Sequence, residues 1–455
     1  MRRGATEPSI LVSNAIAKKP RIDKPSTRKN MGTEFGKHSA TGNSSATTTT
    51  PSFVKTALTK PQKEPDMNVR KLNSPDDQPD RTSPAAPASV DRYKGALLGC
   101  ALGDAVGAWA ERRPVDEAKE FAKSFIREFE FSKIGTHHHG MRFGQYTDDT
   151  QLTHELMLSL IDEQGFDPDD FAGRIARIFA HGKIVGYGRA TQEAAVRLLD
   201  GVSWEEAGTP PPRAGNGAAM RAGPIGLFFY YDVNACVKAA ADQAIITHKA
   251  PLSVAAAVAV ALATAMSMSA SKTTTGPHEM GWWTWLAAHV HTNSPEFAQD
   301  IRGLTKLVWD GRKTAQWKAA SAEEFEAASE YVLEGDDPNW EGVSPWARSS
   351  TLWALYCVMA HPTNVWKAIE TAVAIGGDSD TIAAMAGTIV GANVGIEGFP
   401  QMALEEVAPL LHDVKAERYT WEGLEPLASA LHVIVTTQHE ARVSAWEADL
   451  PDPGE

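Results

Sequence analysis

Two short acidic stretches contain the side chains best suited to chemistry. The first is YTDDTQL at residues 146–152, and the second is GGDSDTI at residues 376–382. Threonine and aspartate before an apolar helical pattern are typical of N-caps, but one aspartate is enough for a cap. Four carboxylates among small or apolar neighbours would repel one another and lose hydration. A pair of divalent cations would relieve both penalties, and oxygen-only ligands favour Mg²⁺ or Mn²⁺ over zinc.

Six oxygen-bearing side chains in these stretches are candidate ligands of a two-metal centre. They are Thr147, Asp148, Asp149, Asp378, Asp380 and Thr381. The dipoles of helix N-termini oppose cation binding, so the negative charge of the ligands has to outweigh them. Taken alone, each stretch fits a helix cap as well as it fits a metal site.

A glycine-faced helix is predicted at residues 93–111, whose sequence is YKGALLGCALGDAVGAWAE. Its glycines recur at intervals of four: Gly95, Gly99, Gly103 and Gly107. Each glycine costs a helix roughly 1 kcal/mol relative to alanine, so this face indicates the close approach of another backbone. Asp104 lies inside the stretch, and Glu111 follows about two turns later on the same face. On this segment alone we favour a tightly packed core helix in which Asp104 caps a neighbouring helix.

Two glycine-rich loops could hold a diphosphate. They are HGKIVGYGRAT at residues 181–191 and GNGAAMRAGPIG at residues 215–226, and both lead into helical patterns. Exposed backbone N–H groups at such places favour phosphate, to which Arg221 and His248 could add charge or hydrogen bonds. Tyr187 could stack on a base. Neither loop follows a strand, as a Walker A motif or a dinucleotide fingerprint would, so an ordinary helix–helix connection is the alternative for each.

The elements that have to position these residues are helices. From about residue 90 onward, apolar residues recur with helical spacing and strand-like alternation is hard to find. We therefore predict an all-α fold. The expected helices are 93–111, 150–163, 171–181, 191–199, 235–246, 252–269, 294–308, 322–333, 350–360, 364–374, 381–394 and two more near the C-terminus.

One uncharged run, residues 251–271, is long enough to cross a bilayer. It consists mostly of alanine, serine and threonine, and alanine drives membrane insertion weakly. Its larger side chains repeat every four residues: Val254, Val258, Leu262 and Met266. This one-sided stripe predicts a buried helix, so we expect no membrane association.

Residues 1–90 differ in composition from the rest of the chain. They hold 10 of the 27 prolines and 15 basic against 8 acidic side chains, and they lack apolar periodicity. Too little apolar surface is available to offset the entropy of ordering, so we predict a disordered tail over 1–90 and a catalytic domain over 91–455. A basic patch at 18–21 fits a nuclear-import signal, but a solvated basic tail is the favoured interpretation.

Charge and cysteine usage exclude some functional classes. Residues 91–455 carry 29 basic and 49 acidic side chains, a balance of −20, which argues against a nucleic-acid-binding domain. The three cysteines are odd in number and far apart, at 100, 236 and 357. That spacing fits neither a disulfide framework nor a zinc finger, so we expect a reducing, cytoplasmic location.

Read in order, these segments resemble the ADP-ribosylglycohydrolase family, which includes dinitrogenase-reductase-activating glycohydrolases and ADP-ribosylarginine and ADP-ribosylserine hydrolases. The matching landmarks are GALLGCALGDAVGAWAE at 95–111, YTDDTQLT at 146–153, GYGRAT at 186–191, GNGAAMRAGPIG at 215–226, Thr247–His248 and GGDSDT at 376–381. The resemblance implies a compact, orthogonally packed multi-helix domain with a binuclear Mg²⁺ centre, in which Mn²⁺ can substitute.

The resemblance also implies roles for particular residues. The six candidate ligands fall on the metal positions, and Glu111 falls where the family has a mobile acidic residue near the distal ribose. Positions that hold the ADP part are Gly186, Tyr187, Gly188, Gly215, Asn216, Gly217, Met220, Arg221 and His248. Asp149 or Glu111 would act as the base that activates water or as the acid that protonates the leaving group.

The implied function is hydrolysis of the bond between ADP-ribose and a side-chain nitrogen or oxygen. The partner would be an ADP-ribosylated protein or a small molecule containing ADP-ribose, and the chain would act as a monomer. The first alternative is a regulatory protein that binds ADP-ribose without turnover. The second is another divalent-metal-dependent helical hydrolase, for example a zinc enzyme using His137–His139 or a phosphohydrolase using His412–Asp413; neither has companion residues at suitable spacing.

Overall fold

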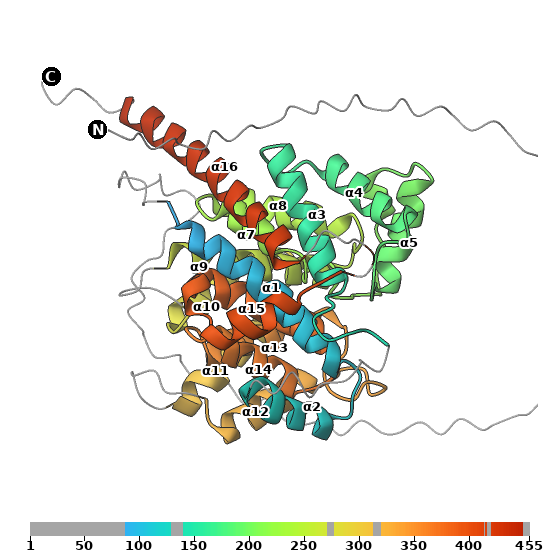
Figure 1. The fold of residues 1–455 in the computed structure, drawn as a ribbon, viewed down its shortest axis with the longest axis vertical. Helices are drawn as coiled ribbons and strands as arrows, with labels where there is room; N and C mark the ends of the chain where they lie inside the picture. The colour runs from blue at the N-terminus through green and yellow to red at the C-terminus, as the bar shows by residue number, and fades with distance from the viewer. Residues whose placement is uncertain are drawn as a thin grey trace, which may run out of the picture. The chain divides into compact units, whose positions relative to one another are not determined.

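The computed structural model describes residues 87–128, 140–270, 277–312, 320–413, 415 and 420–448. Regular structure in these residues is helical, and β pairing is limited to isolated bridges, so the all-α prediction is confirmed (Figure 1). The described residues belong to one compact unit. The tail predicted up to residue 90 lies outside the described residues as far as residue 86, and so do His137–His139.

The helices in chain order are α1 Val90–Ala110, α2 Val115–Phe121, η1 Ala122–Ile126, α3 Asp148–Asp162, α4 Pro168–Ala180, α5 Arg189–Leu199, α6 Trp204–Ala207, α7 Gly223–Phe229, α8 Val233–Ile245, α9 Pro251–Ser269, α10 Met280–Val290, α11 Pro295–Arg312, α12 Ala322–Leu333, α13 Ala347–Ala360, α14 Val365–Ala374, α15 Ser379–Val394, η3 Ile396–Gly398, η4 Ala403–Val407, η5 Ala408–Leu410 and α16 Trp421–Ala448.

The glycine face of α1 packs against α15, and the two helices run antiparallel side by side (Figure 1). A Cβ added to Gly99 would lie 2.1 Å from the carbonyl oxygen of Gly387, and one added to Gly107 would lie 2.4 Å from that of Ser379. The close backbone approach predicted from the glycine spacing is therefore present. Because the helices are antiparallel, the C-terminal end of α1 meets the N-terminal end of α15.

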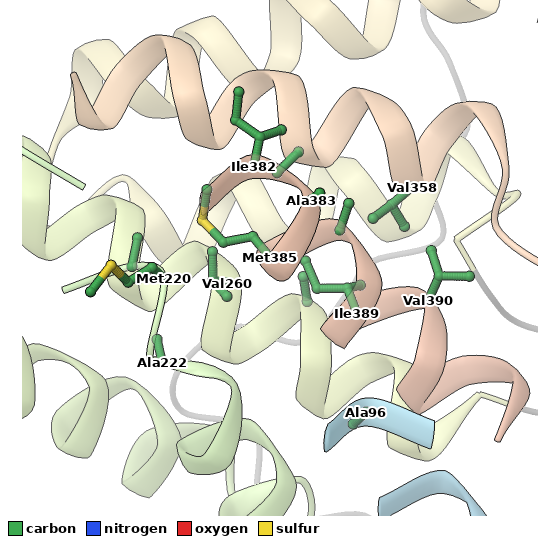
Figure 2. Close-up of a cluster of buried hydrophobic side chains, with 14 of the residues drawn as sticks. Ala96, Met220, Ala222, Val260, Val358, Ile382, Ala383, Met385, Ile389 and Val390 are labelled. Atoms are coloured by element: carbon green, nitrogen blue, oxygen red, sulfur yellow. The ribbon is translucent and has the colours of Figure 1, made fainter. Parts of the chain in front are cut away.

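The uncharged run forms the buried helix α9, which contacts α7, α8, α13 and α15. It is long and apolar enough to span a membrane, but 83% of its most apolar window is buried inside the protein. Figure 2 shows the cluster that α15 contributes to this core: Ile382, Met385 and Ile389 project among Val260 of α9 and Val358 of α13. Dense packing of this kind fixes the positions of the helix ends at which polar side chains gather.

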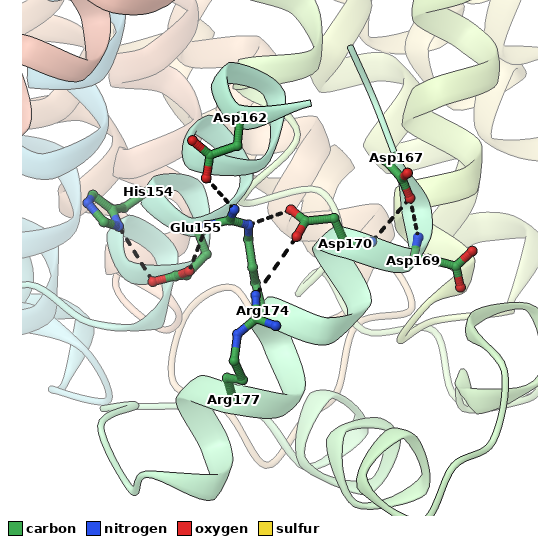
Figure 3. A network of polar contacts seen from close by, with 8 residues as sticks. All are labelled: His154, Glu155, Asp162, Asp167, Asp169, Asp170, Arg174 and Arg177. Atoms are coloured by element: carbon green, nitrogen blue, oxygen red, sulfur yellow. Dashed lines mark hydrogen bonds and ion pairs between the residues drawn. The ribbon is translucent and has the colours of Figure 1, made fainter. Parts of the chain in front are cut away.

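An ion-pair network fixes α4 against α3 (Figure 3). Arg174 of α4 contacts Asp162 of α3 at 2.6 Å and Asp170 at 2.5 Å, and its side chain is only 11% exposed. Asp167 caps α4 by accepting from the backbone N–H groups of Asp169 and Asp170. The α4–α5 connection, which contains the first glycine-rich loop, therefore extends from a fixed helix.

Most predicted helices are present with ends shifted by a few residues, but four α-helices were not predicted: α2, α6, α7 and α10. In place of the two helices expected near the C-terminus, the described residues after α15 form the short η3, η4 and η5 and one long α-helix, α16. Helix α7 begins with Gly223-Pro224 and contains Gly226, residues that normally signal a turn. A Cβ at Gly226 would lie 2.3 Å from the carbonyl oxygen of Ala261 on α9. Tertiary packing on α9 therefore overrides the weak local helix propensity of this segment.

Candidate active site

Both acidic stretches face one cavity of about 370 Å³, although they lie about 230 residues apart in the chain. The cavity is lined by Asp148 and Asp149 at the start of α3 and by Asp378, Asp380 and Thr381 at the start of α15. All five side chains are at most 7% exposed. The structure therefore brings together five of the six candidate ligands.

Thr147, the sixth candidate ligand, lies just behind the cavity lining. Its hydroxyl donates to Asp104 Oδ1 at 2.8 Å and lies 3.3 Å from Asp149 Oδ2. Its backbone N–H also donates to Asp104. Donation to Asp104 leaves oxygen lone pairs on Thr147 that can still face a cation.

Asp104 anchors α3 from inside α1. Its carboxylate accepts from the backbone N–H and the hydroxyl of Thr147 and from the backbone N–H and the hydroxyl of Thr150. These bonds satisfy N–H groups at the N-terminus of α3 that have no partner within the helix. The structure thus confirms that Asp104 caps a neighbouring helix, and this cap aims Asp148 and Asp149 at the cavity.

The antiparallel α1–α15 pair places Glu111 beside the second acidic stretch. One carboxylate oxygen each from Glu111, Asp378 and Asp380 lies within 4.8 Å of the others. Ser379 fixes this junction because its hydroxyl donates to the carbonyl oxygen of Gly107 at 2.8 Å. The sequence analysis placed Glu111 near the ribose and not among the metal ligands. In the structure, Glu111 is close enough to Asp378 and Asp380 to share a cation with them.

Burial perturbs the acidity of this whole cluster. It raises the pKa of Glu111 to about 7, helped by the nearby Asp378, and the pKa of Asp378 to about 6. Burial, followed by repulsion from neighbouring carboxylates, also raises the pKa values of Asp148, Asp149 and Asp380 well above their usual range. Such a cluster is unfavourable when ionised unless a cation neutralises it.

The donor set fits divalent cations. Asp149 Oδ1 is buried and has no hydrogen-bond partner among the described residues. A buried carboxylate oxygen left unpaired is costly, and coordination of an ion would remove that cost. The surrounding donors are carboxylate and hydroxyl oxygens, which suit hard cations such as Mg²⁺ or Mn²⁺.

The glycine-rich loops form the other walls of the cavity. Gly186, Tyr187, Gly188, Gly215, Asn216, Gly217 and Met220 all line it, as the sequence indicated. Gly186 has φ +78°, and a Cβ there would approach Asp148 Oδ1 to 3.2 Å. Asn216 donates its side-chain amide to Asp378 Oδ2 at 2.5 Å, which links the second loop to the acidic cluster. Tyr187 is 39% exposed and packs edge-on against Phe179.

His248 lies beneath the second glycine-rich loop, where a Cβ on Gly217 would come within 2.9 Å of its ring. Burial and the nearby Arg221 lower the pKa of His248 to about 3, so the ring is neutral. Thr247 Oγ1 accepts from Arg221 and lies 2.8 Å from His248 Nδ1, within hydrogen-bond distance. Nε2 is the ring nitrogen that lies near Gly215 and Gly217.

Arg221 does not line the cavity, although the sequence placed it among the residues that hold the ADP part. It is fully buried, and its guanidinium donates to Gln243, Thr247 and the carbonyl oxygen of Gly217. Burial lowers the pKa of Arg221 to about 9. All of these bonds hold the second glycine-rich loop from behind, so Arg221 supports the wall without forming its surface.

Sequence reasoning missed three cavity residues outright, namely Arg112, Trp340 and Pro345; Arg189, Ala190 and Thr191 also line the cavity and end the first glycine-rich loop, but were not singled out there. Arg112 adopts φ +57°, which an arginine rarely does and which no sequence pattern indicated. Trp340 directly follows the turn signal DDPN at 336–339, a segment whose composition indicates only a connection. A tryptophan placed in a polar turn was a signal that could have pointed to a binding surface.

The His412–Asp413 pair has a supporting role. Asp413 accepts from the side-chain amide of Gln151, whose own oxygen accepts from the backbone N–H of Val185. Lys415 donates to the carbonyl oxygen of Ile184. Asp413, through Gln151, and Lys415 therefore hold the segment that precedes Gly186, and the cavity lining does not include the His412–Asp413 pair.

The family model described as ADP-ribosylglycohydrolase matches residues 85–440. The chain is 26% identical over 337 residues to the ADP-ribosylarginine hydrolase Tri1 of Pseudomonas putida (strain GB-1), covering 70% of this chain and 75% of that protein. It is 27% identical over 348 residues to the ADP-ribosylhydrolase ARH3 of Mus musculus. That match covers 70% of this chain and 87% of ARH3.

A solved structure described as an ADP-ribosylglycohydrolase-related protein complex superposes with a TM-score of 0.50 at 25% identity, covering 76% of this chain and 98% of that one. The family match spans most of the chain, and the shared fold is the framework that brings the acidic stretches together. This chain therefore belongs to the ADP-ribosylglycohydrolase family and is a glycosidic-bond hydrolase.

Proposed function

We propose that this protein hydrolyses the glycosidic bond between ADP-ribose and a protein side chain or another acceptor, with two divalent cations, Mg²⁺ or Mn²⁺, in the acidic cavity. The observation that carries the proposal is the convergence of both acidic stretches and Glu111 on one buried cavity. The names of Tri1 and ARH3 describe hydrolases of ADP-ribosyl groups, which supports the same substrate group here.

The residues that would hold the ions are those of the two acidic stretches. They are Asp148, Asp149, Asp378, Asp380 and Thr381, with Thr147 behind them and Glu111 beside them. Bound cations would supply Lewis-acid polarisation of substrate oxygens and would lower the pKa of water. Asn216 fixes the orientation of Asp378 through its amide.

Glu111 is suited to proton transfer. Burial and the nearby Asp378 raise its pKa to about 7, so it can hold or release a proton near neutral pH. It could protonate the leaving oxygen or nitrogen, or take a proton from the attacking water. Anionic side chains around the anomeric carbon would stabilise the positive charge that builds up as the bond breaks.

The glycine-rich walls would hold the ADP part. Their backbone N–H groups can donate to phosphate oxygens, and so can the neutral His248 when its ring hydrogen is on Nε2. Tyr187 stands 39% exposed at the same wall, where an adenine or ribose could pack on it.

A chelation experiment tests this proposal. ADP-ribose release from a mixture of arginine-linked and serine-linked substrates should stop with EDTA and return with Mg²⁺ or Mn²⁺. Asp148→Asn and Asp380→Asn should each lower kcat about 100-fold or more while leaving the protein folded. Asp200→Asn, at an exposed helix end, is the matched control and should retain wild-type activity.

The results that contradict the proposal are equally specific. Full activity in metal-free protein would exclude the metal centre. Tight ADP-ribose binding without release of free ADP-ribose from any of these substrates would identify a binding protein instead.

A further inference from the structure

The cavity rim next to Asp378 carries a fixed cation. The backbone N–H of Arg112 donates to the carbonyl oxygen of Gly377 at 3.0 Å, directly before Asp378. Its guanidinium carbon lies 3.9 Å from the centre of the Trp340 ring, and the arginine side chain is 57% exposed. Cation–π stacking and the backbone bond together hold a positive charge at the mouth of the cavity.

The segment that carries Trp340 is itself held against the acidic stretch. Asp378 donates its backbone N–H to the carbonyl oxygen of Val343 at 2.8 Å. A Cβ on Gly342 would lie 2.4 Å from the carbonyl carbon of Gly376, so this contact is as close as backbones allow. Trp340 therefore keeps a fixed position relative to the carboxylates, and Arg112 with it.

Arg112 also lies beside the carboxylate of Glu111. The distance from Arg112 Nε to Glu111 Oε1 is 3.6 Å, and the glutamate side chain is 21% exposed. A substrate guanidinium that approached Glu111 would find the guanidinium of Arg112 already beside that carboxylate. The approaching group would instead meet a like charge.

We infer that Arg112, held by Trp340, is a specificity-determining residue that disfavours arginine-linked acceptors and selects uncharged, O-linked acceptors such as serine. This inference rests on the proposed function, in which the glycine-rich walls hold the ADP part beside Asp148. The acceptor then lies at the rim formed by Glu111, Arg112 and Trp340. An arginine acceptor carries a guanidinium that stays charged at neutral pH, whereas an O-linked serine does not.

The expected size of the effect follows from Coulomb's law. Two unit charges on the order of 6 Å apart at a partly exposed rim repel by enough to change a rate about tenfold or somewhat more. Because the rim is exposed, salt should weaken this discrimination, which distinguishes a charge effect from a purely steric one.

The test compares two peptides of identical sequence that carry ADP-ribose on serine or on arginine. Wild-type protein with Mg²⁺ should show a kcat/KM ratio favouring the serine linkage by at least about tenfold at low salt. Arg112→Gln should reduce this ratio about tenfold, whereas Arg112→Lys, which keeps the charge, should retain most of it. Trp340→Leu, which frees the guanidinium, should give an intermediate ratio.

Arg113→Gln is the matched control, because Arg113 stacks on Trp109 and does not line the cavity. Its ratio should equal that of the wild type. A wild-type preference for the arginine linkage, or an Arg112→Gln ratio within about twofold of wild type, would overturn the inference while leaving the proposed hydrolysis intact. Failure of wild-type protein to cleave either peptide would overturn both.

Discussion

At the scale of single residues, the site is a set of carboxylates whose environment opposes their ionisation. Asp148, Asp149, Asp378 and Asp380 are almost fully buried, and Glu111 is close to them. Among the described residues lining the cavity, the arginines at its rim are Arg112 and Arg189, and His248 is neutral. The cluster therefore depends on added cations to reach its charged form.

This dependence predicts how Mg²⁺ acts on stability at different pH values. The pKa values of about 7 for Glu111 and about 6 for Asp378 lie above those of an unfolded chain, which are near 4. Between about pH 4 and pH 7 the native metal-free protein binds more protons than the unfolded protein, so its stability falls as the pH rises.

Cations bind the ionised carboxylates, so the increase in Tm on adding Mg²⁺ should be larger near pH 8 than near pH 5. Differential scanning fluorimetry with and without Mg²⁺, from pH 5 to pH 8, measures this increase in Tm. Asp148→Asn should reduce the increase at every pH. An increase in Tm that is constant across the range would contradict the assigned cluster.

At the scale of elements, the site is assembled by contacts at helix ends. Helices α1 and α15 are so close that added Cβ atoms would overlap the opposing backbone, and this pairing brings Glu111 to Asp378 and Asp380. Asp104 of α1 holds the N-terminus of α3 and aims Asp148 into the same cavity. One helix therefore positions both acidic stretches.

The close α1–α15 contact predicts a large cost for a single methyl group. Gly99→Ala should lower the free energy of unfolding by about 1–3 kcal/mol or more, because the new Cβ would lie 2.1 Å from the Gly387 carbonyl oxygen. Gly281→Ala is the control: Gly281 lies in α10 with no neighbouring atom within 4 Å of its added Cβ. In urea unfolding, the free energy of unfolding of that variant should equal the wild-type value or exceed it by up to about 1 kcal/mol. Equal stabilities of the two variants would argue against the backbone contact.

The cap formed by Asp104 makes a second prediction at this scale. Asp104→Asn places an amide where four donors converge. The free energy of unfolding should therefore fall by about 2 kcal/mol or more. Activity should also fall, because Asp148 and Asp149 follow the displaced start of α3. Asp167→Asn, at the cap of α4, should cost little since asparagine caps as well as aspartate. Thermal melts and kinetic assays of both variants check this, and an unaffected Asp104→Asn would show that α3 does not depend on the cap.

At the scale of the whole molecule, the site combines segments from most of the described chain, from Glu111 directly after α1 to Thr381 in α15. The glycine spacing predicted the α1 contact correctly, because glycines at intervals of four leave one helix face without side chains and a neighbouring backbone can then approach it. The glycine-rich loop residues likewise reached the cavity. Both features could be predicted because each depends on residues that are close together in the sequence.

The features of the site and the fold that could not be predicted from the sequence depend on tertiary contacts. The buried position of Arg221 arises from its bonds to Gln243 and Thr247, and no local pattern distinguishes such an arginine from a phosphate ligand. The Arg112–Trp340 stack joins residues more than 200 positions apart through a left-handed backbone conformation at Arg112. Helix α7 forms on α9 despite its turn-like sequence.

The central claim is that both acidic stretches bind divalent cations together. The most direct measurement is the number of Mn²⁺ ions bound per chain, obtained by equilibrium dialysis with electron paramagnetic resonance of the free and bound ion. We predict about two ions per wild-type chain, magnetically coupled to each other, and a clear loss of binding in Asp148→Asn as well as in Asp380→Asn. Wild-type protein that binds no Mn²⁺ above background, or a variant of one stretch that leaves binding by the other unchanged, would contradict a shared site.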